Sequence, residues 1–256
     1  MGYLTWLDIV TAIVEICVIV VIIAKTIKLT INTRTNALPF FFALSLSSYL
    51  LSSVYWIAYD FLKPDTRMPM ACNEICECAV ILLLCAGLDA ILKDHEKLVG
   101  EILFAILFTV ANIALWIAWS GEWLQDILFG IPYIYFIWLL IRGLKSRECL
   151  SRKELWLAAA AGVMVLAMQL PQFFVDGIVF KLIEGLNFVV MLALTIWIGI
   201  KSFRCKDFFL AATFFLWTEL FSFLNANLYY YAFSFANLIA LLVMYSLLEK
   251  EIAVDG

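Results

Sequence analysis

Residues 9–24 read IVTAIVEICVIVVIIA, an apolar run whose only charged residue is Glu15. A helix of roughly 20 such residues, rising 1.5 Å per residue, crosses about 30 Å of hydrocarbon. Leu186–Ile200 is a second block of the same kind. Neither block shows the strict alternation of an outer-membrane barrel, and lipid offers no partner to an open backbone. Both blocks therefore predict membrane-spanning helices.

The composition extends this prediction to the whole chain. Of its 256 residues, 65% are hydrophobic and 15% are charged. A soluble domain has about 45–50% apolar and about 25% charged residues, because water must meet a polar surface. The connections between apolar blocks are short. We therefore predict an all-α, polytopic transmembrane helical bundle that forms one integral membrane domain over residues 1–256, with no soluble domain and the lipid bilayer as its surroundings.

Apolar blocks and polar breaks together predict about nine spans. The expected helices cover residues 4–27, 38–62, 72–92, 98–119, 122–143, 154–174, 177–200, 207–224 and 228–248. The last two meet at Asn225-Ala-Asn227, the weakest boundary, so eight spans are the alternative. Gly130-Ile-Pro132 is the one stretch that resembles a helix break inside a span, because proline removes a backbone hydrogen bond.

Basic residues predict the orientation. When the connections are numbered alternately from an outer N-terminus, all of the 17 basic residues except Lys63, Arg67 and Lys181 fall on the inner side. Basic residues near helix ends stay cytoplasmic. We therefore predict an external N-terminus, a cytoplasmic C-terminus and a place in the cell (plasma) membrane. Residues 1–8 contain no Lys or Arg, so we expect the first helix to be retained rather than cleaved as a signal.

Three carboxylates lie well inside predicted spans: Glu15, Glu184 and Glu219. A charge at the bilayer centre costs at least about 2.5–3.5 kcal/mol, so such residues face protein or water, or are protonated. Lys181 and Glu184 are three residues apart and can pair on one helical face, in a structural or a functional role. Glu15 and Glu219 have no evident partner in the sequence and are the best candidates for a proton, cation or amine site.

A polar stripe runs along the second predicted helix. Its members, which helical spacing places on one face, are Ser45, Ser48, Ser52, Tyr55 and Tyr59. The stripe is typical either of a ligand cavity or of helix packing through hydroxyl hydrogen bonds. The predicted ligand-binding set combines four of these residues with the intramembrane charges: Glu15, Ser48, Ser52, Tyr55, Tyr59, Lys181, Glu184 and Glu219.

Residues 68–78 concentrate methionine and cysteine, which suit a soft metal, but the spacing lacks C-x-x-C and cysteines in apolar helices usually act as small hydrophobes. We therefore predict no metal and no cofactor. The one histidine, His95, excludes bis-histidine haem ligation within one chain and an H-E-x-x-H zinc site. No Walker motif is present. The basic loops are too short and too near the bilayer to predict nucleic-acid binding.

Three functions remain open. The first, which we favour, is a membrane-embedded sensor or ligand-binding module that acts with a cytoplasmic or membrane protein partner. The expected outer side is rich in acidic residues, so a cationic or amine ligand from that side is the expected partner. The second is a small transporter or channel subunit for a cation or amine, and the third is an intramembrane lipid-modifying enzyme. The missing catalytic motifs favour a protein that is not an enzyme.

Overall fold

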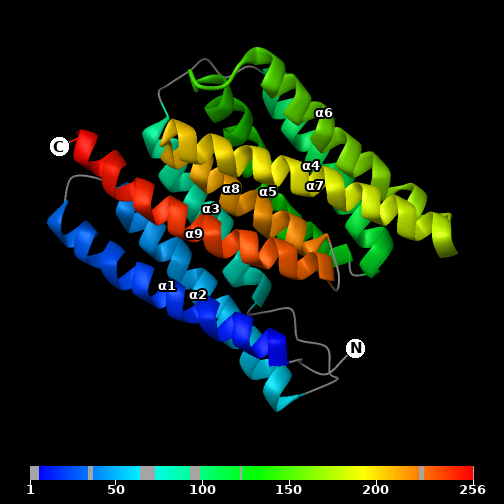
Figure 1. The fold of residues 1–256 in the computed structure, drawn as a ribbon, viewed down its shortest axis with the longest axis horizontal. Helices are drawn as coiled ribbons and strands as arrows, with labels where there is room; N and C mark the ends of the chain where they lie inside the picture. The colour runs from blue at the N-terminus through cyan, green and yellow to red at the C-terminus, as the bar shows by residue number, and fades with distance from the viewer. Residues whose placement is uncertain are drawn as a thin grey trace. The chain divides into compact units, whose positions relative to one another are not determined.

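The computed structural model describes residues 6–33, 37–63, 73–92, 99–121, 123–224 and 228–255. Within these ranges all regular structure is helical, which confirms the all-α prediction (Figure 1). The helices are α1 (Trp6–Asn32), α2 (Leu38–Leu62), α3 (Asn73–Ile91), α4 (Val99–Ser120), α5 (Trp123–Lys145), α6 (Arg152–Gln169), the 3₁₀ helix η1 (Pro171–Phe173), α7 (Gly177–Cys205), α8 (Phe208–Phe223) and α9 (Leu228–Asp255).

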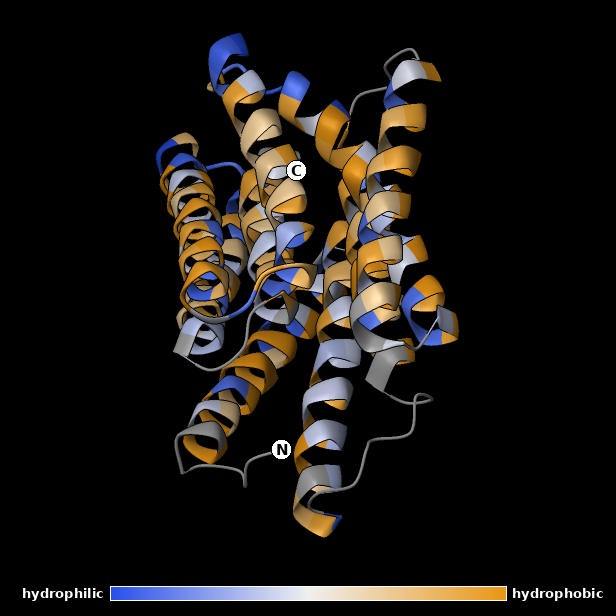
Figure 2. Cartoon of the chain, turned by 90° about the vertical axis from the view of Figure 1, so that its right-hand side faces the viewer, coloured by the Kyte–Doolittle hydropathy of each residue, from blue (hydrophilic) through white to orange (hydrophobic). Residues whose placement is uncertain are grey.

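Seven of the described helices are long and apolar enough to cross a membrane. Large hydrophobic side chains are exposed along these helices, and Figure 2 shows hydrophobic residues along much of their length. Water would penalise that exposure and lipid does not, because lipid tails are themselves apolar. The chain is therefore a multi-pass integral membrane protein. The count of nine spans and the orientation stay predictions; α3, with 19 residues, and α8, with 16, are not among the seven.

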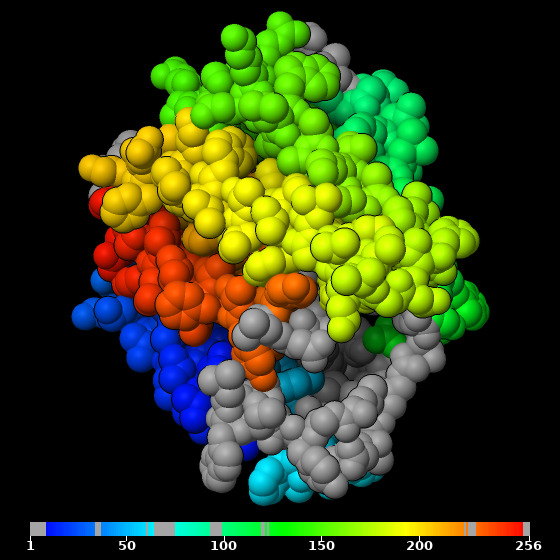
Figure 3. Space-filling model, turned by 45° about the vertical axis from the view of Figure 1, so that its right-hand side comes forward, coloured from blue at the N-terminus to red at the C-terminus, as the bar shows by residue number. Residues whose placement is uncertain are grey.

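Helix α7 shows how the sequence separates a lipid-facing side from a packed side. Its exposed hydrophobic residues recur at helical spacing: Ile178, Leu182, Leu186, Val189, Ile196, Ile200 and Phe203. The opposite face is buried and holds Asn187, Met191 and Ile198. Figure 3 shows α7, in yellow, at the surface of the molecule. Such a wide apolar stripe on the exposed side of a helix is the expected pattern when lipid takes the place of water.

Gly130-Ile-Pro132 resembles a break in the sequence but does not interrupt the predicted span. Helix α5 continues through Pro132 from Trp123 to Lys145. Membrane helices tolerate proline because neighbouring groups and local adjustments compensate for the lost backbone hydrogen bond. Breaks between helices occur instead where glycine allows a positive φ, at Gly121 between α4 and α5 and at Gly177, the first residue of α7.

The chain divides into two compact units. The first is Met1–Ile113 with Ser120–Leu139, and the second is Ala114–Trp119 with Leu140–Gly256. Within the first unit, α2 packs against both α1 and α3 (Figure 1). The prediction of a single membrane domain stays a prediction.

In the second unit α8 contacts α7 and α9, and α6 contacts α7. The side chains of α8 are buried continuously from Phe208 to Thr218, as expected for a helix that is apolar all round. Its first turn is capped by Asp207, whose side chain accepts a hydrogen bond from the backbone N–H of Leu210 at 3.0 Å. Ser151 and Glu154 form a capping box at the start of α6. These caps define where the two helices begin.

Candidate functional site

A direct polar contact joins α8 to α9 in the second unit. The Nδ2 of Asn237 donates a hydrogen bond to Oε1 of Glu219. Asn237 is 4% exposed, and its Oδ1 is buried with no hydrogen-bond partner among the described residues. Glu219 is half-buried. An ionised carboxylate and an amide oxygen are both acceptors, so this pair presents acceptor capacity to a proton, a metal cation or an amine.

A row of aromatic rings connects α7, α8 and α9. Its ring contacts, in order from α7 through α8 and α9, are Trp197–Trp217, Trp217–Phe221, Phe221–Phe233, Phe188–Phe233 and Phe188–Tyr229, with centroids 4.2–6.4 Å apart. Trp217 and Phe221 are four residues apart and share a face of α8, whereas Glu219 lies between them in sequence and points away from that face. The row therefore packs α7 against the α8–α9 pair and leaves Glu219 outside it.

Glu15, the second of the two best candidates among the intramembrane carboxylates, also finds a partner. The side chain of Glu15 on α1 is half-buried and is hydrogen-bonded by the side chain of Tyr49 on α2. This contact lies within the first unit, whereas Glu219 and Asn237 lie in the second. The predicted site residues are divided in the same way: Glu15, Ser48, Ser52, Tyr55 and Tyr59 belong to the first unit, and Lys181, Glu184 and Glu219 to the second.

The polar stripe of α2 is divided among different partners. The hydroxyl of Ser45 donates to the carbonyl of Val80 on α3 at 2.9 Å, and that of Ser52 donates to Oε1 of Glu77 at 3.3 Å. The hydroxyl of Ser48 instead donates to the carbonyl of Leu44 in its own helix. Hydroxyl contacts of this kind join and shape packed helices. Ser45 and Ser52 thus match the helix-packing interpretation of the stripe.

The remaining members of the predicted set are near helix ends. The rings of Tyr55 and Tyr59 lie 6.1 Å apart, and the ammonium of Lys63 is 6.0 Å from the Tyr59 centroid. On α7, Lys181 is exposed and Glu184 is half-buried. The salt bridge that their spacing allows is not formed between these two described side chains.

The sulfur-rich segment is described only from residue 73 onward, so Met68, Met70 and Cys72 lie outside the described residues. Within the described part of α3, Cys76 is buried and the thiol of Cys78 donates to the carbonyl of Leu128 on α5 at 3.5 Å. No group of metal-binding side chains is found in the described part of the chain.

Sequence reasoning missed Asn237, Tyr49 and a disulfide between Cys149 and Cys205. An amide inside an apolar span was the available signal for Asn237, because a buried amide needs polar partners. Nothing in the sequence indicated the cysteine pair, whose members are 56 residues apart. Comparisons with protein-family models, with curated proteins and with solved structures find no match to the chain.

Proposed function

We propose that the protein is a membrane-embedded sensor or ligand-binding module for a cation or an amine. The observation that carries this proposal is the contact between Glu219 and Asn237, which leaves the buried Oδ1 of Asn237 without a partner among the described residues. A buried polar atom without a hydrogen bond costs about 1–3 kcal/mol. A ligand that donates hydrogen bonds or carries positive charge recovers that cost.

Helix α9 supplies a physical route for a signal. It continues without interruption from Leu228 to Asp255, so Asn237 lies about 27 Å from the end of the helix at 1.5 Å per residue. The final turns carry Glu249, Lys250 and Glu251 on the end predicted to be cytoplasmic. A ligand that binds one packing of α8 and α9 better than another shifts the population of that packing, and a partner protein at the C-terminal end of α9 would detect the shift.

The test uses purified full-length protein in lipid nanodiscs. Tm is followed by tryptophan fluorescence during titration with NaCl, methylammonium chloride and choline chloride, with N-methyl-D-glucamine chloride holding ionic strength constant. Binding to the folded state alone stabilises it by RT ln(1 + [L]/Kd), so we expect Tm to rise and then saturate with one probe class. Glu219→Gln should abolish the rise. Glu148→Gln, which neutralises an exposed carboxyl of the same unit outside the predicted set, should preserve it.

The same protein in sealed liposomes distinguishes a sensor from the alternatives. The sensor proposal expects no uptake of the stabilising cation. Uptake that Glu219→Gln abolishes would instead support the transporter, and turnover of the surrounding lipid would support the enzyme. A Tm that no probe changes would contradict the ligand-binding site itself.

A further inference from the structure

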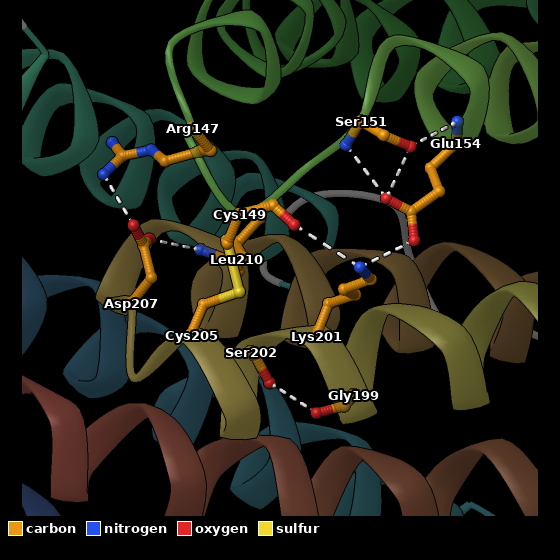
Figure 4. The surroundings of a disulfide bond; sticks show 10 residues. All are labelled: Arg147, Cys149, Ser151, Glu154, Gly199, Lys201, Ser202, Cys205, Asp207 and Leu210. Atoms are coloured by element: carbon orange, nitrogen blue, oxygen red, sulfur yellow. Dashed lines mark hydrogen bonds and ion pairs between the residues drawn. A yellow bond between two sulfur atoms is a disulfide. The ribbon is translucent and has the colours of Figure 1, made fainter.

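In the second unit, a disulfide joins the connection between two helices to the end of a third helix. It connects Cys149, in the segment between α5 and α6, to Cys205, the last residue of α7 (Figure 4). Cys149 is exposed and Cys205 is half-buried. A reagent in the surrounding solution can therefore reach the bond.

Two ion pairs hold the same segments together on either side of the disulfide. Arg147 pairs with Asp207 at 2.7 Å, and Lys201 pairs with Glu154 at 2.6 Å (Figure 4). The ammonium of Lys201 also donates to the carbonyl of Cys149 at 3.4 Å. The segment is thus docked by contacts that do not depend on the sulfur–sulfur bond. These contacts keep the two thiols close when the bond is reduced.

The surroundings of the pair are strongly basic. Arg147, Lys201, Arg204 and Lys206 all lie within four residues of one of the two cysteines. Neighbouring positive charge stabilises a thiolate, which is the reactive form of cysteine. The same basic residues are those that predict a cytoplasmic location for this end of the helices. The cytoplasm keeps ordinary thiols reduced, so a disulfide there is typically transient and catalytic or redox-sensing.

We propose that Cys149 and Cys205 form a reversible redox site, reduced in resting cells and oxidised by an external disulfide of a small thiol or of a dithiol protein. One cysteine thiolate attacks a sulfur of the external disulfide; that bond breaks, and one external thiolate leaves with the electron pair. The second cysteine then attacks the resulting mixed disulfide, which forms the Cys149–Cys205 bond and releases the second external thiolate. The two protons lost by the cysteines pass to these leaving thiolates, and reduction follows the reverse path.

The redox state is measured on full-length protein in its native membranes. A variant retains Cys149 and Cys205 and has serine at every other cysteine position. Acid quenching followed by a maleimide-polyethylene glycol tag in denaturant counts the free thiols. We expect two tags in resting cells, none after treatment with diamide, and two again after the oxidant is removed. No tags in resting cells, which marks a permanent structural disulfide, or two tags throughout would overturn the proposal.

The docking contacts provide a second readout. Asp207→Asn removes the charge that pairs with Arg147 while retaining a residue type suited to the helix cap. In the same background this variant should form the disulfide several-fold more slowly with oxidised glutathione. Glu148→Gln, which removes an exposed carboxylate beside Cys149 that makes no ion pair among the described residues, is the matched control and should change the rate less. Equal rates for the two variants would contradict the role given to the Arg147–Asp207 pair.

Discussion

Helices α2 and α8, each considered within its own unit, show how hydroxyl and carboxyl side chains differ in the way their hydrogen bonds are satisfied. Several serines of α2 donate to carbonyls one turn earlier in the same helix, as Ser47, Ser48 and Ser53 do. Helix α8 is almost wholly apolar and buried; its Thr213 and Thr218 also donate to carbonyls of their own helix, whereas Glu219 accepts its hydrogen bond from a different helix. A hydroxyl can share a carbonyl that already accepts a backbone bond, because that oxygen has a second lone pair. A carboxylate only accepts, and the backbone N–H groups inside a helix are already used.

Inside a membrane, a carboxylate predicts a binding site better than a row of hydroxyls does. A stripe of hydroxyls is compatible with a helix that satisfies itself, so it carries little information about ligands. The backbone of its own helix cannot supply a donor to a carboxylate in mid-span, so the position of that carboxylate points to another side chain, to water or to a ligand. Substitutions in the close packing around α8, in the hydroxyl contacts of α2 and in the turn before α8 test how each helix is stabilised.

The largest effect is expected where α5 meets the first turn of α8. A Cβ at Gly143 would overlap the ring of Phe209, which is 1% exposed. Gly143→Ala should therefore lower the free energy of unfolding by about 1–3 kcal/mol, the usual cost of overpacking. The measurement is unfolding in detergent followed by tryptophan fluorescence.

Gly162→Ala on α6 is the control for this substitution, because a Cβ there meets nothing within 4 Å. Alanine is the better helix former by up to about 1 kcal/mol, so this variant should be neutral or slightly more stable. If both alanine variants unfold alike, close packing around α8 is not what stabilises the second unit.

A smaller effect separates two serines of α2. Ser52→Ala removes the hydrogen bond to Glu77 and should cost about 1 kcal/mol. Ser48→Ala removes only a bond to the helix's own backbone and should cost close to nothing. Both are measured as shifts of the unfolding midpoint in the same detergent. Ligand titration of Ser52→Ala and Ser48→Ala also tests the cavity interpretation of the stripe. If a cavity lies along α2, both variants should lose ligand binding without losing stability.

The sequence predicts the helices of this protein better than it predicts their ends. The apolar blocks lie where α3 and α8 are found, to within a residue or two at each end. Helices α7 and α9 continue past their apolar blocks, to Cys205 and Asp255, because charged residues such as Lys and Glu are good helix formers and nothing breaks the helix earlier. Hydropathy reports the part that meets lipid and not the end of the hydrogen-bonded turns.

The candidate site was predicted in part, for a similar reason. Glu219 stands out because a carboxylate in an apolar span is costly. Its partner Asn237 is found only when the packing of α8 on α9 is known, because an amide can find a partner on any neighbouring helix. The disulfide depends even more on the fold, since it joins segments that no local pattern connects.

The smallest expected effect lies in the turn between α7 and α8. Lys206 has a φ of 52°, which makes it the one non-glycine residue with positive φ in the described part of the chain. The left-handed conformation costs a residue with a Cβ roughly 1–2 kcal/mol, but glycine gains about 0.4–1 kcal/mol of freedom in the unfolded chain, so the two contributions largely oppose each other. Lys206→Gly should therefore raise the unfolding free energy by about 0–1 kcal/mol. Lys206→Ala removes the same charge and keeps the Cβ, so it should bring no such gain; if alanine stabilises as much as glycine, the relief comes from the lost charge beside Arg204 and not from the backbone.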